Sequence, residues 1–174
     1  ESFATAVERI GSARWLAREA TPQAREAFAT SEARRAAFRA LTRATRARLA
    51  EIYELKEDPA LDAQALAAMK TEAMQAFRTG YAQLRARWLA APGGATTAQV
   101  AGYDRWAARA NNASFAAQAA YDELVPAFEA LYERKGGDWA RFYDAVRQLS
   151  RQPQPQRHAA LRALLTQNKE TPGA

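Results

Sequence analysis

The first residue of the chain is a carboxylate that could bind a metal. Glu1 opens the segment ESFATAVERIGSARWL, whose apolar residues recur at the three-to-four spacing of an amphipathic helix. A carboxylate on the first turn of a helix can be the third protein ligand of a zinc ion, the other two being the histidines of a HExxH helix. The alternative is that Glu1 is an acid at the positive end of the helix dipole. Glu8 is better explained as a salt-bridge partner than as a ligand.

The histidine and cysteine counts limit the chemistry that this chain can carry by itself. It contains one histidine, His158, and no cysteine. It therefore cannot complete a metal site built on two or three imidazoles or on thiolates. No strand-turn-helix context of the kind that presents a nucleophilic serine surrounds His158. We expect any catalytic site to need residues from outside this sequence, so that the chain alone is inactive.

Two adjacent amides, Asn111 and Asn112, stand in an alanine-rich apolar stretch. Amides in such surroundings cost free energy unless they are hydrogen-bonded. They could orient a peptide backbone in a cleft. Alternatively, Asn111 ends one helix and Asn112 caps the next. The sequence leaves both explanations open.

The elements that must position these residues are predicted to be helices. The 174 residues fit one domain, and 48% hydrophobic with 25% charged residues is the usual balance of a globular protein. No run of about 18 uncharged apolar residues exists to span a membrane, and no stretch shows a convincing strand alternation. We therefore predict an all-α fold in a single helical domain.

Breaks in the apolar pattern divide the predicted domain into four parts. Thr21-Pro22 is a helix start, Asp58-Pro59 restarts the pattern after a short turn, and the segment APGGATT is the clearest loop. The stripes on either side of the turn predict a long antiparallel helical hairpin, followed by a bundle of shorter helices. The four predicted parts are an active-site helix (1–20), the hairpin (21–91), the short-helix bundle (98–166) and a frayed tail (167–174).

Three segments together resemble one protein family. ESFATAVERIGSARWL, YDRWAARANNASFAAQAAYDELVPAFEAL and GGDWARFYDAVRQL resemble the bacterial family called putative aminopeptidases, zinc metallopeptidases of the gluzincin type, and the likeness covers essentially the whole chain. The opening residues are similar to the NEGFA-type segment in which the glutamate binds the metal, with Ser2 in place of glycine. Family members carry a HELAHQ-like zinc motif shortly upstream of this segment, and that motif is absent here.

The resemblance implies a function for a larger protein of which this chain is the C-terminal, all-helical portion. It implies an aminopeptidase that hydrolyses N-terminal peptide bonds, with zinc polarising the carbonyl and activating a water, the HExxH glutamate as general base and Glu1 completing the coordination sphere. The implied partners are a peptide substrate and the remainder of the parent chain. Family members often look like envelope or lipid-anchored proteins, so the resemblance also implies the bacterial envelope or periplasm.

Two tyrosines, Tyr121 and Tyr103, are further candidates under this resemblance. A phenol near a zinc-bound oxyanion can stabilise the tetrahedral intermediate of amide hydrolysis, and zinc aminopeptidases use a tyrosine in this way. Asn111 and Asn112 would then line the cleft. No motif aligns either tyrosine with that role, and most of the six tyrosines are expected at the edge of the core.

The basic residues leave two other functions open. The net charge is +6, and Arg35, Arg39, Arg43 and Arg46 recur at helical spacing, which could attract an anionic membrane surface. Aromatic residues that could stack on bases are not interleaved with them, so we have no strong expectation of nucleic-acid binding; a solvated arginine face is the simpler explanation. The alternatives are a non-enzymatic basic module that binds nucleic acid or anionic lipid, and a structural helical-hairpin interaction protein.

Overall fold

The computed structural model describes residues 1–57, 60–122 and 124–167, and it describes the backbone alone for residues 57, 118–122 and 167. Within these ranges the regular structure is eight α-helices and one short 3₁₀ helix, with no strand, which confirms the predicted all-α class. No helix among the described residues is both long enough and apolar enough to cross a membrane. The predicted tail lies almost wholly outside the described residues.

Contacts between residues divide the chain into two compact units. One, here called the hairpin unit, is Pro22–Gln118; the other, here called the terminal unit, is Glu1–Thr21 together with Ala119–Ala174. Each unit has a hydrophobic core of its own.

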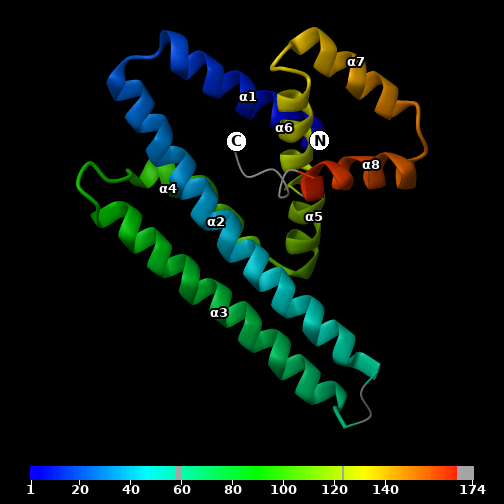
Figure 1. Cartoon of the computed structure of the whole chain (residues 1–174). Helices are drawn as coiled ribbons and strands as arrows, with labels where there is room; N and C mark the ends of the chain where they lie inside the picture. The colour runs from blue at the N-terminus through cyan, green and yellow to red at the C-terminus, as the bar shows by residue number, and fades with distance from the viewer. Residues whose placement is uncertain (58–59, 123, 168–174) are drawn as a thin grey trace. The chain divides into compact units, whose positions relative to one another are not determined.

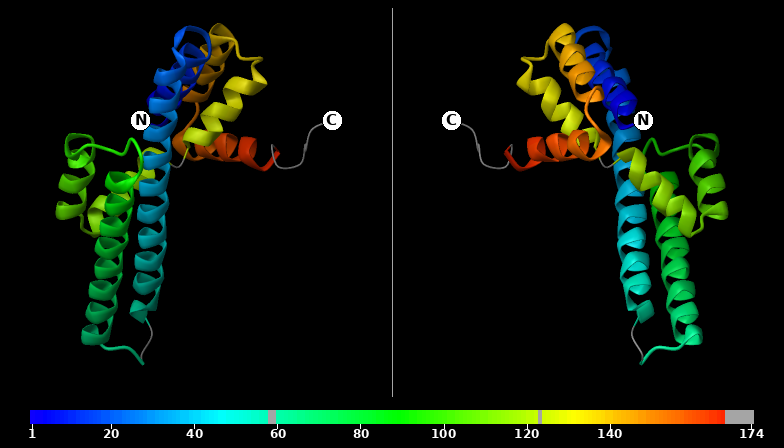
Figure 2. Two further views of the ribbon diagram at one scale, coloured as in Figure 1. Left: turned by 90° about the vertical axis from the view of Figure 1, so that its left-hand side faces the viewer. Right: turned by 90° about the vertical axis from the view of Figure 1, so that its right-hand side faces the viewer.

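The hairpin unit is built on two long helices, α2 (Pro22–Glu54) and α3 (Ala63–Ala90), which lie side by side and run in opposite directions (Figures 1 and 2). The 33 residues of α2 correspond to about 50 Å of helix. Pro22 is the first residue of α2, as predicted, because the missing N–H of proline costs nothing in a first turn. The long antiparallel hairpin is therefore present.

A short turn joins the two long helices. α2 passes into the 3₁₀ helix η1 (Leu55–Glu57), and the predicted restart at Asp58-Pro59 lies outside the described residues. The start of α3 is fixed by Asp62, whose Oδ1 accepts a hydrogen bond from the backbone N–H of Ala65 at 2.7 Å. This is a standard N-cap, and it satisfies one of the free N–H groups of the first turn.

The core of the hairpin unit is aromatic. Phe77 is 1% exposed, and its ring lies 5.8 Å from the ring of Trp106 and 5.0 Å from that of Phe115, both edge to face. These two rings belong to α4 (Thr97–Arg109) and α5 (Asn112–Asp122), so the shorter helices complete the core that the long helices begin. Gly80 allows the long helices to approach, because a Cβ at this position would lie 2.8 Å from Cδ1 of Leu41.

One polar cluster joins α3 to α4. The hydroxyl of Tyr81 donates to Oδ1 of Asp104 at 2.5 Å, and Nε of Arg85 donates to the same oxygen at 2.8 Å. The hydrogen bond from Tyr81 and the guanidinium of Arg85 hold the pKa of Asp104 below its usual range. Burial, together with the Asp104 carboxylate, raises the pKa of the Tyr81 hydroxyl well above its usual range.

The terminal unit is organised around α6 (Val125–Arg134), which packs against α1 (Ser2–Glu19), α7 (Trp139–Ser150) and α8 (Gln154–Gln167). Because three helices cover it, Val125 and Ala127 are fully buried. The prolines of QPQPQ predict that the last helix starts at Arg157, but α8 begins at Gln154, since Pro155 is tolerated in the first turn of a helix.

We predict that replacing Asp104 destabilises the hairpin unit in a pH-dependent way. Asp104→Asn should lower the free energy of unfolding at pH 7 by about 1 kcal/mol, because the side chain is 35% exposed and solvent weakens the interaction. The pKa of Asp104 is lowered in the fold, so the difference should be full above the ordinary aspartate pKa of about 4 and vanish as the pH falls through the lowered value.

Urea unfolding of both proteins at pH 7 and at about pH 3 measures this difference. The control is Asp144→Asn, which removes an exposed pair with Arg147 and should change stability little. A difference of equal size at both pH values would contradict the role assigned to the Asp104 carboxylate.

Candidate functional site

Glu1 lies at the N-terminal end of α1 with its side chain exposed. It is the N-cap residue of the helix, but its carboxylate makes no capping hydrogen bond to the first turn. Its backbone oxygen accepts the first intrahelical bond, from the N–H of Thr5 at 3.1 Å. Capping of its own helix therefore does not occupy the carboxylate.

The first turn of α1 is held in place by close packing. Ser2 is 7% exposed and Ala6 is fully buried, so small side chains bring the helix into contact with the core of the terminal unit. The ring of Phe3 lies 5.7 Å from that of Phe128 and 5.9 Å from that of Phe142. The backbone that carries Glu1 is thus fixed by its immediate neighbours.

The second half of α1 is fixed by a polar contact. Nη1 of Arg14 donates to the backbone oxygen of Gly137 at 2.7 Å and to the hydroxyl of Tyr132. That hydroxyl also donates to the Gly137 oxygen, at 2.6 Å. Gly137 has φ +68°, a left-handed conformation that glycine adopts without strain. Arg14 therefore ties α1 to the turn between α6 and α7.

The metal chemistry predicted for Glu1 is incomplete within this chain. The structure, over the residues that it describes, brings together no group of three or more His, Cys, Asp or Glu side chains that could hold a metal ion. Glu8, two turns along α1, is also exposed. The residues of this chain do not by themselves fit a zinc site, and Glu1 is the ligand that they could contribute.

Asn111 and Asn112 make different contacts. Oδ1 of Asn111 accepts from the backbone N–H of Ser114 at 3.1 Å, so Asn111 caps the start of α5. Nδ2 of Asn112 donates to the hydroxyl of Tyr53 at 2.6 Å. The helix boundary that the sequence indicated is present, and the capping residue is Asn111. The substrate-binding role of both residues stays a prediction.

Tyr103 lies within an aromatic cluster of the hairpin unit. Its ring is 5.0 Å from that of Phe38 and 5.2 Å from that of Trp88. The side chain of Tyr121 lies outside the described residues. Glu1 belongs to the terminal unit, whereas Tyr103 and the two asparagines belong to the hairpin unit. Neither unit alone contains the complete predicted set.

The predicted arginine stripe lies on α2 and is partly neutralised. Nη1 of Arg35 is 2.7 Å from Oε1 of Glu32, and Nη2 of Arg39 is 4.0 Å from its other carboxylate oxygen. Arg43 and Arg46 are exposed. One glutamate thus faces two of the four arginines, which weakens the field of this surface.

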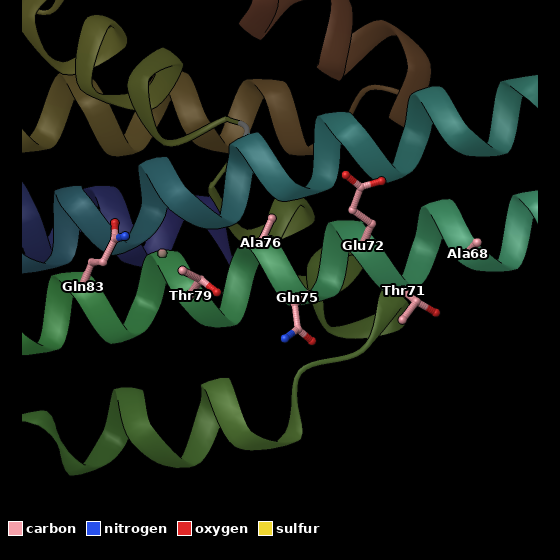
Figure 3. A pocket seen from close by; sticks show the side chains of 8 residues that line it. Ala68, Thr71, Glu72, Gln75, Ala76, Thr79 and Gln83 are labelled. Carbon is pink, nitrogen blue, oxygen red and sulfur yellow. The ribbon is translucent and has the colours of Figure 1, made fainter.

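A groove of about 780 Å³ follows one face of α3 (Figure 3). Its one ionisable side chain is Glu72, so it offers no pair of groups for acid–base chemistry. Figure 3 shows Glu72 and Gln83 directed toward α2, and Thr71 directed away from it. The side chains that line this groove are small or polar: Ala68, Thr71, Glu72, Gln75, Ala76, Thr79, Gly80 and Gln83.

Sequence reasoning missed two features of the hairpin unit. One is the Tyr81–Asp104–Arg85 cluster, for which the sequence offers only the spacing of Tyr81 and Arg85, one turn apart on a helix. The other is a second groove, between α2, α3 and the loop before α4. Arg87 and Trp88 line this groove, but in the sequence they are indistinguishable from ordinary surface and core residues.

Comparison with protein-family models matches residues 1–161 to the family described as "Putative aminopeptidase". The match spans all of the hairpin unit and most of the terminal unit, ending in α8. Comparison with curated proteins gave no match, and neither did comparison with solved structures.

We predict that Arg14 stabilises the terminal unit and the position of α1. Arg14→Ala should lower the free energy of unfolding by about 2 kcal/mol, because a charge-assisted hydrogen bond is lost and the Gly137 oxygen loses one donor. Chemical denaturation gives the size of the change, and hydrogen exchange should show faster exchange in α1. Arg18→Ala, at an exposed position on the same helix, is the control and should have little effect. Equal effects of the two substitutions would contradict the prediction.

Proposed function

The chain belongs to the putative aminopeptidase family, and from this membership we propose that it is the helical part of a zinc-dependent peptidase of the gluzincin type. The family supports a peptidase-related role. The proposal adds zinc as the metal and the N-terminal peptide bond of a peptide as the substrate. The observation that carries it is the family match, which spans residues 1–161 and so includes Glu1.

Glu1 is the residue through which we propose that the chain reaches the metal. Three observations support it: the carboxylate is exposed, it does not cap its own helix, and the backbone beneath it is fixed by the packing of Ser2 and Phe3. A metal ligand needs such support, because small displacements of a ligand cost affinity. The histidine ligands and the general base would come from a HExxH segment of the same protein, outside these 174 residues.

Both asparagines keep amide N–H groups that could donate to a peptide carbonyl. The side-chain oxygen of Asn111 accepts hydrogen bonds from both the N–H and the hydroxyl of Ser114. Among the described residues the amide nitrogen of Asn111 has no acceptor, whereas Asn112 donates one N–H to Tyr53 and retains the second for a peptide carbonyl. Tyr103 and Tyr121 remain proposals for stabilising the oxyanion. An anionic membrane surface as partner and a location in the bacterial envelope also remain proposals.

We predict that Glu1 is required for metal binding in the natural protein that carries the HExxH segment. Glu1→Gln keeps the size of the side chain and removes its charge. It should abolish zinc retention, measured by elemental analysis after dialysis, and lower the hydrolysis rate of amino-acid amides by at least about 100-fold. Glu8→Gln, at an exposed position on the same helix, should leave both unchanged.

Two results, one from this experiment and one from a comparison of substrates, would be decisive against the proposal. Zinc retention and hydrolysis by Glu1→Gln at the level of the unaltered protein would remove Glu1 as a ligand. Equal hydrolysis of an N-acetylated peptide and its free-amine counterpart would show that the enzyme does not require a free N-terminus and is therefore not an aminopeptidase.

A further inference from the structure

The hairpin unit contains a second groove that the proposed function does not use. It lies between the first turns of α2, the last turns of α3 and the loop that leads into α4, with a volume of about 600 Å³. Volumes of about 300 to 1,000 Å³ are typical of small-molecule sites. Small residues of α2 are among those that line it: Ala27, Thr30 and Ala33.

Two arginines from different helices line this groove. Arg34 belongs to α2 and Arg87 to α3. Among the described residues neither guanidinium is ion-paired with a carboxylate. Glu26 also lines the groove, so its ionised side chains sum to one positive charge, from two arginines and one glutamate. A charge of this sign and size suits a ligand with a single negative charge.

The loop side of the groove is built by a turn of fixed shape. Gly93 has φ +63°, and a Cβ at Gly94 would lie only 2.6 to 2.9 Å from the backbone oxygens of Ala91, Trp88 and Leu89. Only glycine allows the backbone to pass so close. The turn ends at Thr96, which forms a capping box with Gln99 and starts α4. The N-terminus of α4 therefore adds partial positive charge at the groove.

An indole forms the apolar wall of the groove. Trp88 is half-buried, and its ring lies 5.2 Å from that of Tyr103 and 6.4 Å from that of Tyr81. These two ring contacts hold the indole in place. A ligand would meet a fixed aromatic surface beside the two guanidinium groups.

We propose that this groove binds a small monocarboxylate that carries an apolar body. Arg34 and Arg87 donate charge-assisted hydrogen bonds to the carboxylate, and Trp88 packs against the apolar body. Glu26 disfavours a phosphate, whose second negative charge it would repel, and the groove is larger than a phosphate requires. The carboxylate could belong to the C-terminal residue of a peptide or to a simple carboxylic acid. In a peptide, the amide N–H of that residue could donate a hydrogen bond to Glu26. This inference does not depend on the metal chemistry proposed above.

The test is a titration of the 174-residue chain, followed by NMR at the amides of Gly93 and Gly94, which lie in the wall of the groove. The probe is N-acetyl-L-phenylalanine, and its amide is the matched uncharged ligand. We expect the amide to bind at least about tenfold more weakly, because it lacks the charge that the arginines recognise. Inorganic phosphate should bind more weakly than the acid. Equal affinity for acid and amide, or tighter binding of phosphate, would overturn the proposal.

Variants of the arginines locate the site independently. Arg34→Gln and Arg87→Gln should each weaken binding of the acid about tenfold. Their controls are Arg43→Gln on α2 and Arg78→Gln on α3, exposed arginines of the same helices that do not line the groove. Equal weakening by the controls would show a general charge effect and contradict the assignment. The comparison of acid with amide uses the unaltered chain, so it decides the matter even where a variant folds poorly.

A third ligand identifies the source of the carboxylate. 3-Phenylpropionate has the same ring and charge as the probe but lacks its amide N–H. Weaker binding than N-acetyl-L-phenylalanine, with the difference abolished by Glu26→Met, which removes the hydrogen-bond acceptor, supports the carboxylate site and assigns it to a peptide C-terminus. Equal binding supports the same site and assigns it to a simple carboxylic acid.

Discussion

The pairing of α2 with α3 is the interaction on which the hairpin unit depends. Isolated helices gain little stability in water, and a helix as rich in arginine as α2 needs a partner that covers its apolar face. The partner is α3, which approaches α2 closely at Gly80 and buries Phe77 in the shared core. α4 and α5 then have an aromatic surface on which to pack. The groove beside Arg34 and Arg87 exists because two helices and one loop converge there.

The helices of the terminal unit are shorter than α2 and α3 of the hairpin unit. None of them could bury a sufficient apolar face alone, so α1, α7 and α8 all pack on α6. The carboxylate of Glu1 stands at the edge of this arrangement, on a helix held by aromatic packing near one end and by Arg14 toward the other. The rigidity of its position comes from the core of the unit and not from contacts of the carboxylate itself.

The sequence was sufficient for those features that depend on local chemistry. Proline at position 22 and the glycines at 93 and 94 mark breaks whatever surrounds them, and apolar spacing indicated the hairpin. The start of α3 was harder, because Asp58-Pro59 and Asp62 are both acceptable helix signals in the sequence, and the capping hydrogen bond of Asp62 is visible only in the structure. The first turn of α8 was missed because Pro155 was read as a breaker.

Features that depend on the pairing of distant helices could not be predicted. Tyr81 and Asp104 lie 23 residues apart, and nothing in the sequence gives the register of α3 against α4 that joins them. The groove is lined partly by small side chains near the place where two helices meet. Such residues form no sequence motif, so the groove cannot be predicted from the sequence. Glu1 became a candidate ligand through its place at the start of a helix and through a resemblance, whereas its exposure and lack of a capping bond required coordinates.

The burial of Ser2 and Ala6 has a consequence for how this protein can vary. Both positions face the core with almost no room, whereas Ala4 between them is exposed and could accept a larger side chain. A larger residue at position 2 or 6 would push the first turn of α1 outward and carry the carboxylate of Glu1 with it. The reach of that carboxylate is therefore set by the volume of two neighbours that have no ionisable group of their own.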